Sequence, residues 1–453
     1  MKAKSAMLVG MLGILAMASP AFSAGFAIIE QSVSGLGNAF AGGAASAEDA
    51  TTVYFNPAGL TRLKGQQAIA GLHVIVPSAK FEKENASNAL GQPISGGNGG
   101  DAGETGIVPN FFYSANLDNG WSLGLGVTAP FGLVTEYDKT WVGRYHGVKS
   151  DVMTININPS VAYKVNDRLS LGAGVSAQYV DVNLTSMVDF GLAAFQSSGG
   201  NPALLPIVSN PDADVYADLT ADDWGYGFNL GVLYEFDDDS RIGLAYRSRI
   251  DHTVEGEGDF SLQNPAFLSA VGLQAAAQAA FPDQDVKGDI TLPASASLSV
   301  FHRINPQWAV MADVLWTEWS TFDWLVIEFD GGLADSVTAE NWDDSWRYAV
   351  GATYSPNEKL DLRLGLAYDE TPVPSAKYRT PRIPCEDRIW TSIGVGYQIG
   401  ERMKIDFAYA HLFVKDSKID KSTADAENLS RGNLQGEYEN EVDIASIQLA
   451  YSF

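Results

Sequence analysis

Alternating apolar and polar residues recur along the chain with the period of a β-strand. In residues 121–128, WSLGLGVT, large apolar side chains hold the odd positions and small or polar ones the even positions. Side chains of a strand alternate between two faces, so one row can contact lipid while the other faces a lumen. This pattern predicts fourteen strands, at residues 66–80, 107–117, 121–137, 151–165, 168–186, 224–236, 240–256, 286–303, 307–328, 343–355, 359–369, 387–398, 402–415 and 439–453.

The connections between these segments alternate strictly in length. The short ones are turns rich in Asn, Asp, Gly and Pro, at residues 118–120, 166–167, 237–239, 304–306, 356–358 and 399–401. Short periplasmic turns and long outer loops are typical of a transmembrane β-barrel, whereas a soluble sandwich mixes its loop lengths. We therefore predict an all-β fold, a fourteen-stranded antiparallel transmembrane β-barrel. Aromatic residues near strand ends are expected in its girdles, namely Trp121, Tyr137, Trp308, Trp390, Tyr397 and Tyr451.

The residues before the first strand divide into two parts. Residues 1–23 combine two early lysines, a short apolar run and small residues ending at Ser23, which predicts a cleaved export signal; a retained anchor is the alternative. Residues 24–65 are rich in Gly, Ala and Ser. Because a fourteen-stranded barrel is wider than its wall side chains can fill, we expect 24–65 to plug it as an N-terminal hatch. Residues 66–453 then form the barrel.

Composition narrows the functional classes. The net charge is −26, whereas phosphate binding requires a basic surface, so we expect no nucleic acid partner. Cys385 is the only cysteine, which excludes an internal disulfide and a Cys-cluster zinc site. The five histidines lack ligand spacing, and no nucleophile and base share a recognisable motif. We expect neither an enzyme nor a bound metal or cofactor.

Two stretches that contain proline interrupt the strand patterns. The first ends the β-like run at 51–55 and comprises Asn56, Pro57 and Ala58. The second lies in the third predicted strand and comprises Pro130, Phe131 and Gly132. Proline lacks an N–H, and unpaired backbone groups are costly in lipid. The second break is either a bulge near the rim or a kink that opens a lateral exit for cargo that prefers lipid to water.

Two predicted outer loops, 187–223 and 257–285, are unusually apolar. Their candidate cargo-contacting residues are Leu192, Phe195, Leu204, Leu205, Phe267, Leu268 and Phe281. Asn264 and Pro265 predict the start of a helix. Helices packed over the barrel mouth and a ligand groove both fit this composition. The aspartates at 212–223 are interpreted as a solvated loop face, with cation bridging to lipopolysaccharide as the alternative.

Several segments, in their order along the chain, resemble the FadL-type outer-membrane transporters of long-chain fatty acids and other hydrophobic compounds. They are SGLGNAFAGGAASAEDATTVYFNPAG, VPNFFYSANLDNGWSLGLGVTAPFGLVTEY, NPQWAVMADVLWTEWS and LGLAYDETPVPSAKYRTPRIPCEDRIW. The resemblance implies a hatch-plugged barrel in a bacterial outer membrane. It also implies passive uptake, with capture in a groove between outer loops, transfer to an inner pocket at the hatch, and lateral release through a kinked third strand.

The resemblance also assigns residues. It implies that Phe26 lines the inner pocket, that Asn56, Pro57 and Ala58 lie against the kink, and that Phe131 and Gly132 lie within it. The basic residues that hold a carboxylate in the family align with Ser186 and a region near Asp343, neither of them basic; Arg347 or Arg144 could substitute.

The partners follow from the same resemblance. The cargo is a long-chain fatty acid or a related hydrophobic small molecule, and a neutral aromatic or aliphatic hydrocarbon, which needs no cation, is the alternative. We also expect contact with outer-membrane lipid, lipopolysaccharide and the outer-membrane assembly machinery, which the terminal Phe453 would address, and a monomer. An outer-membrane lipase or adhesin is the alternative of a different class.

Overall fold

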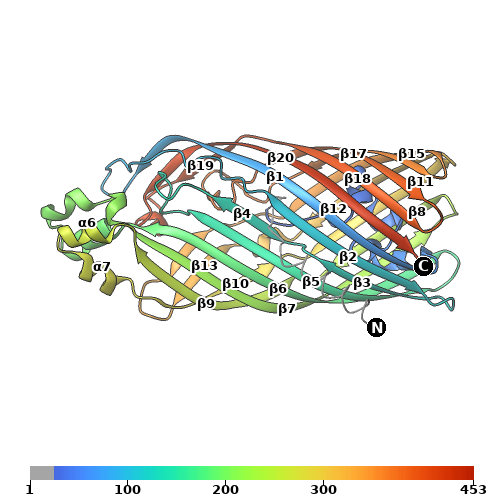
Figure 1. Cartoon of the computed structure of the whole chain (residues 1–453), viewed down its shortest axis with the longest axis horizontal. Helices are drawn as coiled ribbons and strands as arrows, with labels where there is room; N and C mark the ends of the chain where they lie inside the picture. Colours follow the sequence, from blue (N-terminus) through green and yellow to red (C-terminus); the bar gives the residue numbers. More distant parts are fainter. Residues whose placement is uncertain (1–24) are drawn as a thin grey trace.

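The computed structural model describes residues 25–453, and the predicted export signal lies outside the described residues. The chain forms a long closed barrel of tilted strands, with the helices of two outer loops gathered at one end and the C-terminus at the other (Figure 1). The turns that precede β1 (Gln66–Ser87), drawn in blue in Figure 1, lie inside the barrel toward the end that carries the C-terminus. No helix of the described residues is long and apolar enough to span a membrane.

The described residues form fourteen antiparallel wall strands, which confirms the predicted fold. Ten of these strands are single elements: β1 (Gln66–Ser87), β2 (Gly106–Asn116), β5 (Lys149–Lys164), β6 (Leu169–Val188), β7 (Val215–Glu235), β15 (Ser345–Asn357), β16 (Leu360–Asp369), β17 (Arg388–Ile399), β18 (Met403–Val414) and β20 (Asn433–Ser452). The others are interrupted: β3 (Trp121–Thr128) with β4 (Gly132–Glu136), β8 (Ser240–Arg247) with β9 (Ile250–Leu262), β10 (Gln284–Leu292) with β11 (Ser295–Asn305), and β12 (Trp308–Thr317) with β13 (Trp324–Phe329). Two short strands, β14 (Ser336–Ala339) and β19 (Ser417–Lys421), lie in outer loops.

The barrel closes by pairing of its first and last strands, because β1 pairs with both β2 and β20. Several strands continue further outward than the alternation predicted. β7 begins at Val215 instead of 224, and it pairs there with β6 and β9. In this extension Val215 and Ala217 are buried, but the alternate row includes Asp218 and Asp222. The sequence therefore lacks the row of large apolar residues that marks a lipid-facing strand, although the backbone ladder continues.

Large apolar side chains cover the lipid-facing surface. Trp121, Trp308, Tyr397 and Tyr451 are exposed, as girdle residues should be. Two girdle predictions are wrong, because Tyr137 and Trp390 are buried. Trp390 points into the lumen against the hatch, and the Tyr137 hydroxyl donates to the Pro381 carbonyl oxygen at 2.7 Å within the outer loops.

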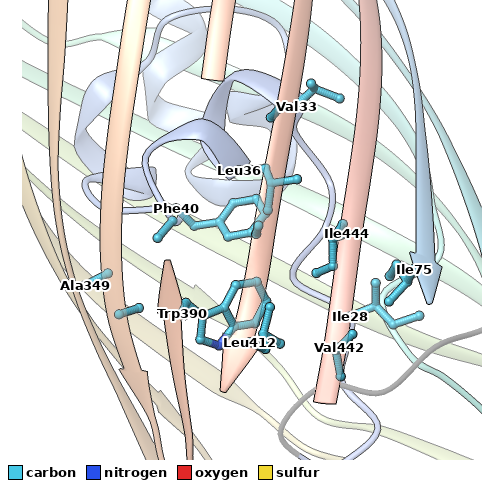
Figure 2. Close-up of a cluster of buried hydrophobic side chains, with 14 of the residues drawn as sticks. Ile28, Val33, Leu36, Phe40, Ile75, Ala349, Trp390, Leu412, Val442 and Ile444 are labelled. Carbon is cyan, nitrogen blue, oxygen red and sulfur yellow. The ribbon is translucent and has the colours of Figure 1, made fainter. Parts of the chain in front are cut away.

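The hatch consists of short turns packed against the wall. Its elements are α2 (Val33–Gly37), α3 (Gly43–Ser46), α4 (Thr52–Phe55) and η1 (Pro57–Arg62). Figure 2 shows Leu36 and Phe40 of the hatch beside Trp390 and Leu412 of the wall. The wall approaches closely because it carries glycine at the contact: a Cβ on Gly243 would lie 1.9 Å from the Ala44 carbonyl oxygen.

The outer end of the barrel carries the remaining helices. They are α5 (Phe190–Ser197), η2 (Pro202–Ile207), η3 (Pro211–Ala213), α6 (Pro265–Ala270), α7 (Gln274–Ala280) and η5 (Ala426–Asn428), whereas η4 (Trp319–Thr321) lies in the interruption between β12 and β13. The predicted helix start is confirmed, because the Asn264 side chain accepts from the Phe267 backbone N–H at 3.1 Å and Pro265 is the first helical residue.

Candidate functional site: a wall gap closed by the hatch

The third wall strand is broken at residues 129–131, between β3 and β4. Toward β5 the ladder runs to Thr128–Asn156 and resumes at Gly132–Met153, so this stretch holds one residue more than its partner. Toward β2 the ladder ends at Val127–Phe111, and among the described residues no ladder joins β2 to β4. The break is therefore a bulge on one side and a gap in the hydrogen-bonded wall on the other.

The start of the hatch occupies this gap as a short substitute strand. The Ile28 N–H donates to the Pro130 carbonyl oxygen at 2.8 Å, and the Gly132 N–H donates to the Phe26 carbonyl oxygen at 2.9 Å. The Gln31 side-chain amide donates to the Ala129 carbonyl oxygen at 2.8 Å. Backbone groups that would be costly beside lipid are thus satisfied by the hatch.

The Asn56 side chain binds residues away from the break, while Pro57 lines a cavity together with Pro130 and Phe131. The Asn56 side-chain amide donates to the carbonyl oxygens of Ala44, at 2.6 Å, and Val232 of β7, at 3.0 Å. It fits because Gly231 has no Cβ; one would lie 2.0 Å from Asn56 Oδ1. Asn56 thus fastens the hatch to β7 instead of to the strand break, and the segment from Phe26 to Ile28 lies on the break.

Phe26 is enclosed by aromatic rings that come from the wall and the outer loops. Its ring centroid lies 4.8 Å from that of Trp319, 5.8 Å from Phe322, and 6.1 Å from both Phe131 and Trp342. Only 5% of Phe26 is exposed. The predicted pocket residue therefore occupies an aromatic site that links the outer loops to the strand break. Trp319, Phe322 and Trp342 were not predicted from the sequence as neighbours of Phe26, although the segment WTEWS carries Trp319.

Two cavities flank the hatch. One of about 100 Å³ lies between the hatch and the inner wall, and Pro57, Pro130 and Phe131 are among its lining residues. The other, about 780 Å³, is lined by polar hatch residues and by residues of the short-turn end. Phe40 and Phe55 line both cavities and stack with centroids 5.9 Å apart. This aromatic pair separates the apolar cavity from the polar one.

Basic side chains of the wall bind the hatch. Arg241 Nε donates to the Ala45 carbonyl oxygen at 2.6 Å, and Arg347 Nη2 donates to the Ala39 carbonyl oxygen at 2.8 Å. Glu48 of the hatch pairs with Arg363 at 2.5 Å, and with Lys404 at 2.8 Å. The hatch is thus held by polar contacts around its circumference, in addition to its apolar packing.

The residues proposed to hold a carboxylate are dispersed. Ser186 lies on β6 and Asp343 is exposed in an outer loop. Arg347 faces the lumen but binds the hatch, with its guanidinium 5.0 Å from the Trp390 ring centroid. Arg144 is buried in the outer loops and pairs with Asp214 at 2.6 Å. The basic residue that lines the cavity at the break is Arg247, which sequence reasoning did not single out.

The apolar loop residues pack mainly on one another. Leu204, Phe267, Leu268 and Phe281 belong to one cluster formed by the loop helices, and Leu192 is buried. Phe195 lies beside Gly200, and Leu205 is exposed. These contacts favour helices that cover the mouth, and the cargo groove stays a prediction.

The aspartates of this region do not form one solvated face, so that prediction is wrong. Asp214 is 1% exposed and also accepts from the Tyr145 hydroxyl at 2.9 Å, whereas Asp218 and Asp222 lie on β7. Asp214 thus joins the loop that carries Arg144 to the start of β7. Residues 25–453 hold no group of three His, Cys, Asp or Glu side chains placed to bind a metal ion.

Known proteins resemble this chain over nearly its whole length. The family described as outer membrane protein transport protein (OMPP1/FadL/TodX) matches residues 14–453. A long-chain fatty acid transport protein of Escherichia coli O6:H1 is 34% identical over 408 residues, 88% of this chain and 89% of the relative. The crystal structure of a Pseudomonas aeruginosa FadL homologue superimposes with a TM-score of 0.86 at 27% identity, covering 95% of this chain and 100% of that one. The Ralstonia pickettii toluene transporter TbuX shares the fold, with a TM-score of 0.64 at 23% identity over 94% of this chain and 100% of that one.

Proposed function

The chain belongs to the outer membrane protein transport family (OMPP1/FadL/TodX), and we propose that it imports long-chain fatty acids or related hydrophobic compounds by passive lateral release through the third wall strand. It is an outer-membrane β-barrel transporter. The observation that supports this route is that, at residues 129–131, the hatch takes the place of a neighbouring wall strand as hydrogen-bond partner. There the barrier between lumen and lipid is a segment of the plug instead of a neighbouring strand.

The hydrogen bonds that hold the hatch at the strand break are weak enough for a bound ligand to displace. Two backbone hydrogen bonds and one from Gln31 hold the hatch to the break, and each contributes a net stabilisation of about 0.5–1.5 kcal/mol. Burial of one methylene group contributes about 0.8 kcal/mol, so about two to six methylene groups match the three bonds. An acyl chain that enters the aromatic cluster around Phe26 displaces this side chain. The first methylene groups replace the apolar contacts of Phe26, and burial of further groups offsets the three hydrogen bonds that hold the adjoining backbone in the gap.

Uptake of labelled oleate by cells that lack their own fatty-acid channel tests this function. We expect uptake only in cells that produce the protein, and a large decrease when Gly132→Trp fills the break in a correctly folded barrel. Oleate uptake indistinguishable from that of empty cells would contradict the proposal. Toluene uptake is measured in parallel. Toluene uptake without oleate uptake would support the same lateral route, but with a neutral hydrocarbon as the cargo.

The same proposal defines the expected partners. Outer-membrane lipid receives the cargo, lipopolysaccharide surrounds the outer strand ends, and the outer-membrane assembly machinery inserts the barrel. A lipase on this barrel would instead hydrolyse ester substrates. Measurement of ester hydrolysis by the purified protein, with and without a serine-reactive reagent, therefore tests the different-class alternative directly.

A further inference from the structure

The cavity at the strand break is mostly apolar but contains one basic side chain. Ile28, Ile29 and Phe55 of the hatch line it, together with Phe131 of the break, and Arg247 of β8 is the one basic residue among the lining residues. Phe131 also belongs to the aromatic cluster around Phe26. The cavity thus adjoins both the inner aromatic site and the gap in the wall.

Arg247 has no carboxylate partner there. Within residues 25–453, no acidic oxygen lies within 4.0 Å of its guanidinium, whereas Arg363 and Arg388 each pair with a carboxylate. The Arg247 side chain donates one hydrogen bond, from Nη2 to the Tyr54 carbonyl oxygen at 3.0 Å, and its guanidinium lies 4.5 Å from the Tyr54 ring centroid. Arg247 is only partly exposed, and it is exposed to this cavity. A cation shielded from water without an anion is costly, so these surroundings favour an anionic ligand.

The acid that shares the cavity is already engaged. Asp313 of β12 lines the same cavity and accepts a hydrogen bond from the Ser299 hydroxyl. It forms no ion pair with Arg247 among the described residues. Arg247 therefore keeps donors available for a third group that enters the cavity.

We infer that Arg247 holds the carboxylate of a fatty acid at the strand break, so that this chain selects carboxylate-bearing cargo over neutral hydrocarbons. The inference rests on the proposed transport function and specifies its substrate class. A guanidinium presents paired N–H groups that match the two oxygens of a carboxylate. One water requires about 10–15 Å³ of such space, so the cavity of about 100 Å³ takes a carboxylate and the first methylene groups. The rest of the chain then lies along the aromatic residues around Phe26.

Competitive binding to the purified protein in lipid nanodiscs tests this assignment, with oleate and methyl oleate as a charged and an uncharged ligand of the same chain. Arg247→Met, which keeps the length of the side chain, should weaken oleate binding about 10- to 100-fold, the range for a lost charge-assisted hydrogen bond. Methyl oleate binding should stay within about twofold, and Arg247→Lys should retain part of the oleate affinity.

Arg241→Met is the matched control, because Arg241 also binds hatch carbonyl oxygens but does not line this cavity. It should leave the ratio of oleate to methyl oleate binding unchanged. Three results would overturn the assignment of Arg247. The first is an equal weakening of oleate and methyl oleate binding in Arg247→Met, and the second is an unchanged oleate affinity in that variant. The third is a selective loss of oleate affinity in Arg241→Met equal to that in Arg247→Met. If the unmodified protein bound and imported neither ligand, the proposed function itself would fail.

Discussion

Replacement of Phe26 with alanine removes the side chain that seats the hatch beside the strand break. Truncation of a buried phenylalanine costs about 3–5 kcal/mol, and Phe26 has the burial and the four aromatic neighbours of a core residue. Because each 1.4 kcal/mol is a factor of ten, local opening of the segment should become about 100- to 3,000-fold more frequent. The Ile28 and Gly132 amides report this opening, since both bond across the hatch and the wall.

Hydrogen exchange of the protein in nanodiscs measures this change. The Ile28 and Gly132 amides should exchange faster in Phe26→Ala, while the Leu36 amide, which bonds to the Ser32 carbonyl oxygen at 2.9 Å within the hatch, should stay protected. Phe407→Ala, on the lipid-facing surface, is the control truncation. Unchanged protection at Ile28 and Gly132 would refute the reasoning, as would equal loss of protection at Leu36.

Three further perturbations address the hatch and the outer loops. Burial raises the pKa of the Glu30 carboxyl to about 7 from 4.5, so the seated hatch retains a proton that an exposed glutamate loses. The stability of the seated hatch should therefore fall as pH rises from about 4.5 to above 7. Glu30→Gln should abolish this pH dependence in hydrogen-exchange measurements corrected for intrinsic rates. Asp214→Ala leaves the buried Arg144 without its carboxylate partner, at a cost of about 3–5 kcal/mol, so protease added to intact cells should cleave the outer loops. The control Asp212→Ala, at an exposed aspartate, should stay resistant. Equal resistance of the two variants would contradict this prediction. Gly243→Val places a side chain against a hatch carbonyl oxygen that a Cβ would meet at 1.9 Å, and should sensitise cells to large antibiotics, whereas Gly97→Val, with open space around it, should not.

The features that follow from repetition were predictable from the sequence. Strand number, antiparallel order and the six short turns depend on alternation and on turn residues, which recur in every hairpin. The break at Pro130 was visible because proline and glycine contradict a strand locally. The helix start at Asn264 depends on two adjacent residues, and the structure has it where the sequence placed it.

Features that depend on contacts between distant residues were not predictable. The Asn56 side chain was expected against the break, yet its partners are the Ala44 carbonyl oxygen and a β7 carbonyl oxygen, and no local pattern encodes this choice. Asp214 was expected in solvent because an aspartate in an acidic loop usually is; its burial depends on Arg144, 70 residues away in sequence. Arg247 drew no attention because a lone arginine in a strand gives no signal until the cavity beside it is known.

Oleate uptake with the hatch locked to the wall tests the central claim most directly. Ala27 and Phe131 form an antiparallel bridge across the break, and facing residues in such a bridge are close enough for a disulfide. The double variant Ala27→Cys with Phe131→Cys is produced in a Cys385→Ser background. Lateral release predicts that oxidation abolishes oleate uptake by this variant and that reductant restores it. Oleate uptake by either single cysteine variant should not respond to oxidation. Undiminished uptake by the fully oxidised protein would contradict lateral release at this break.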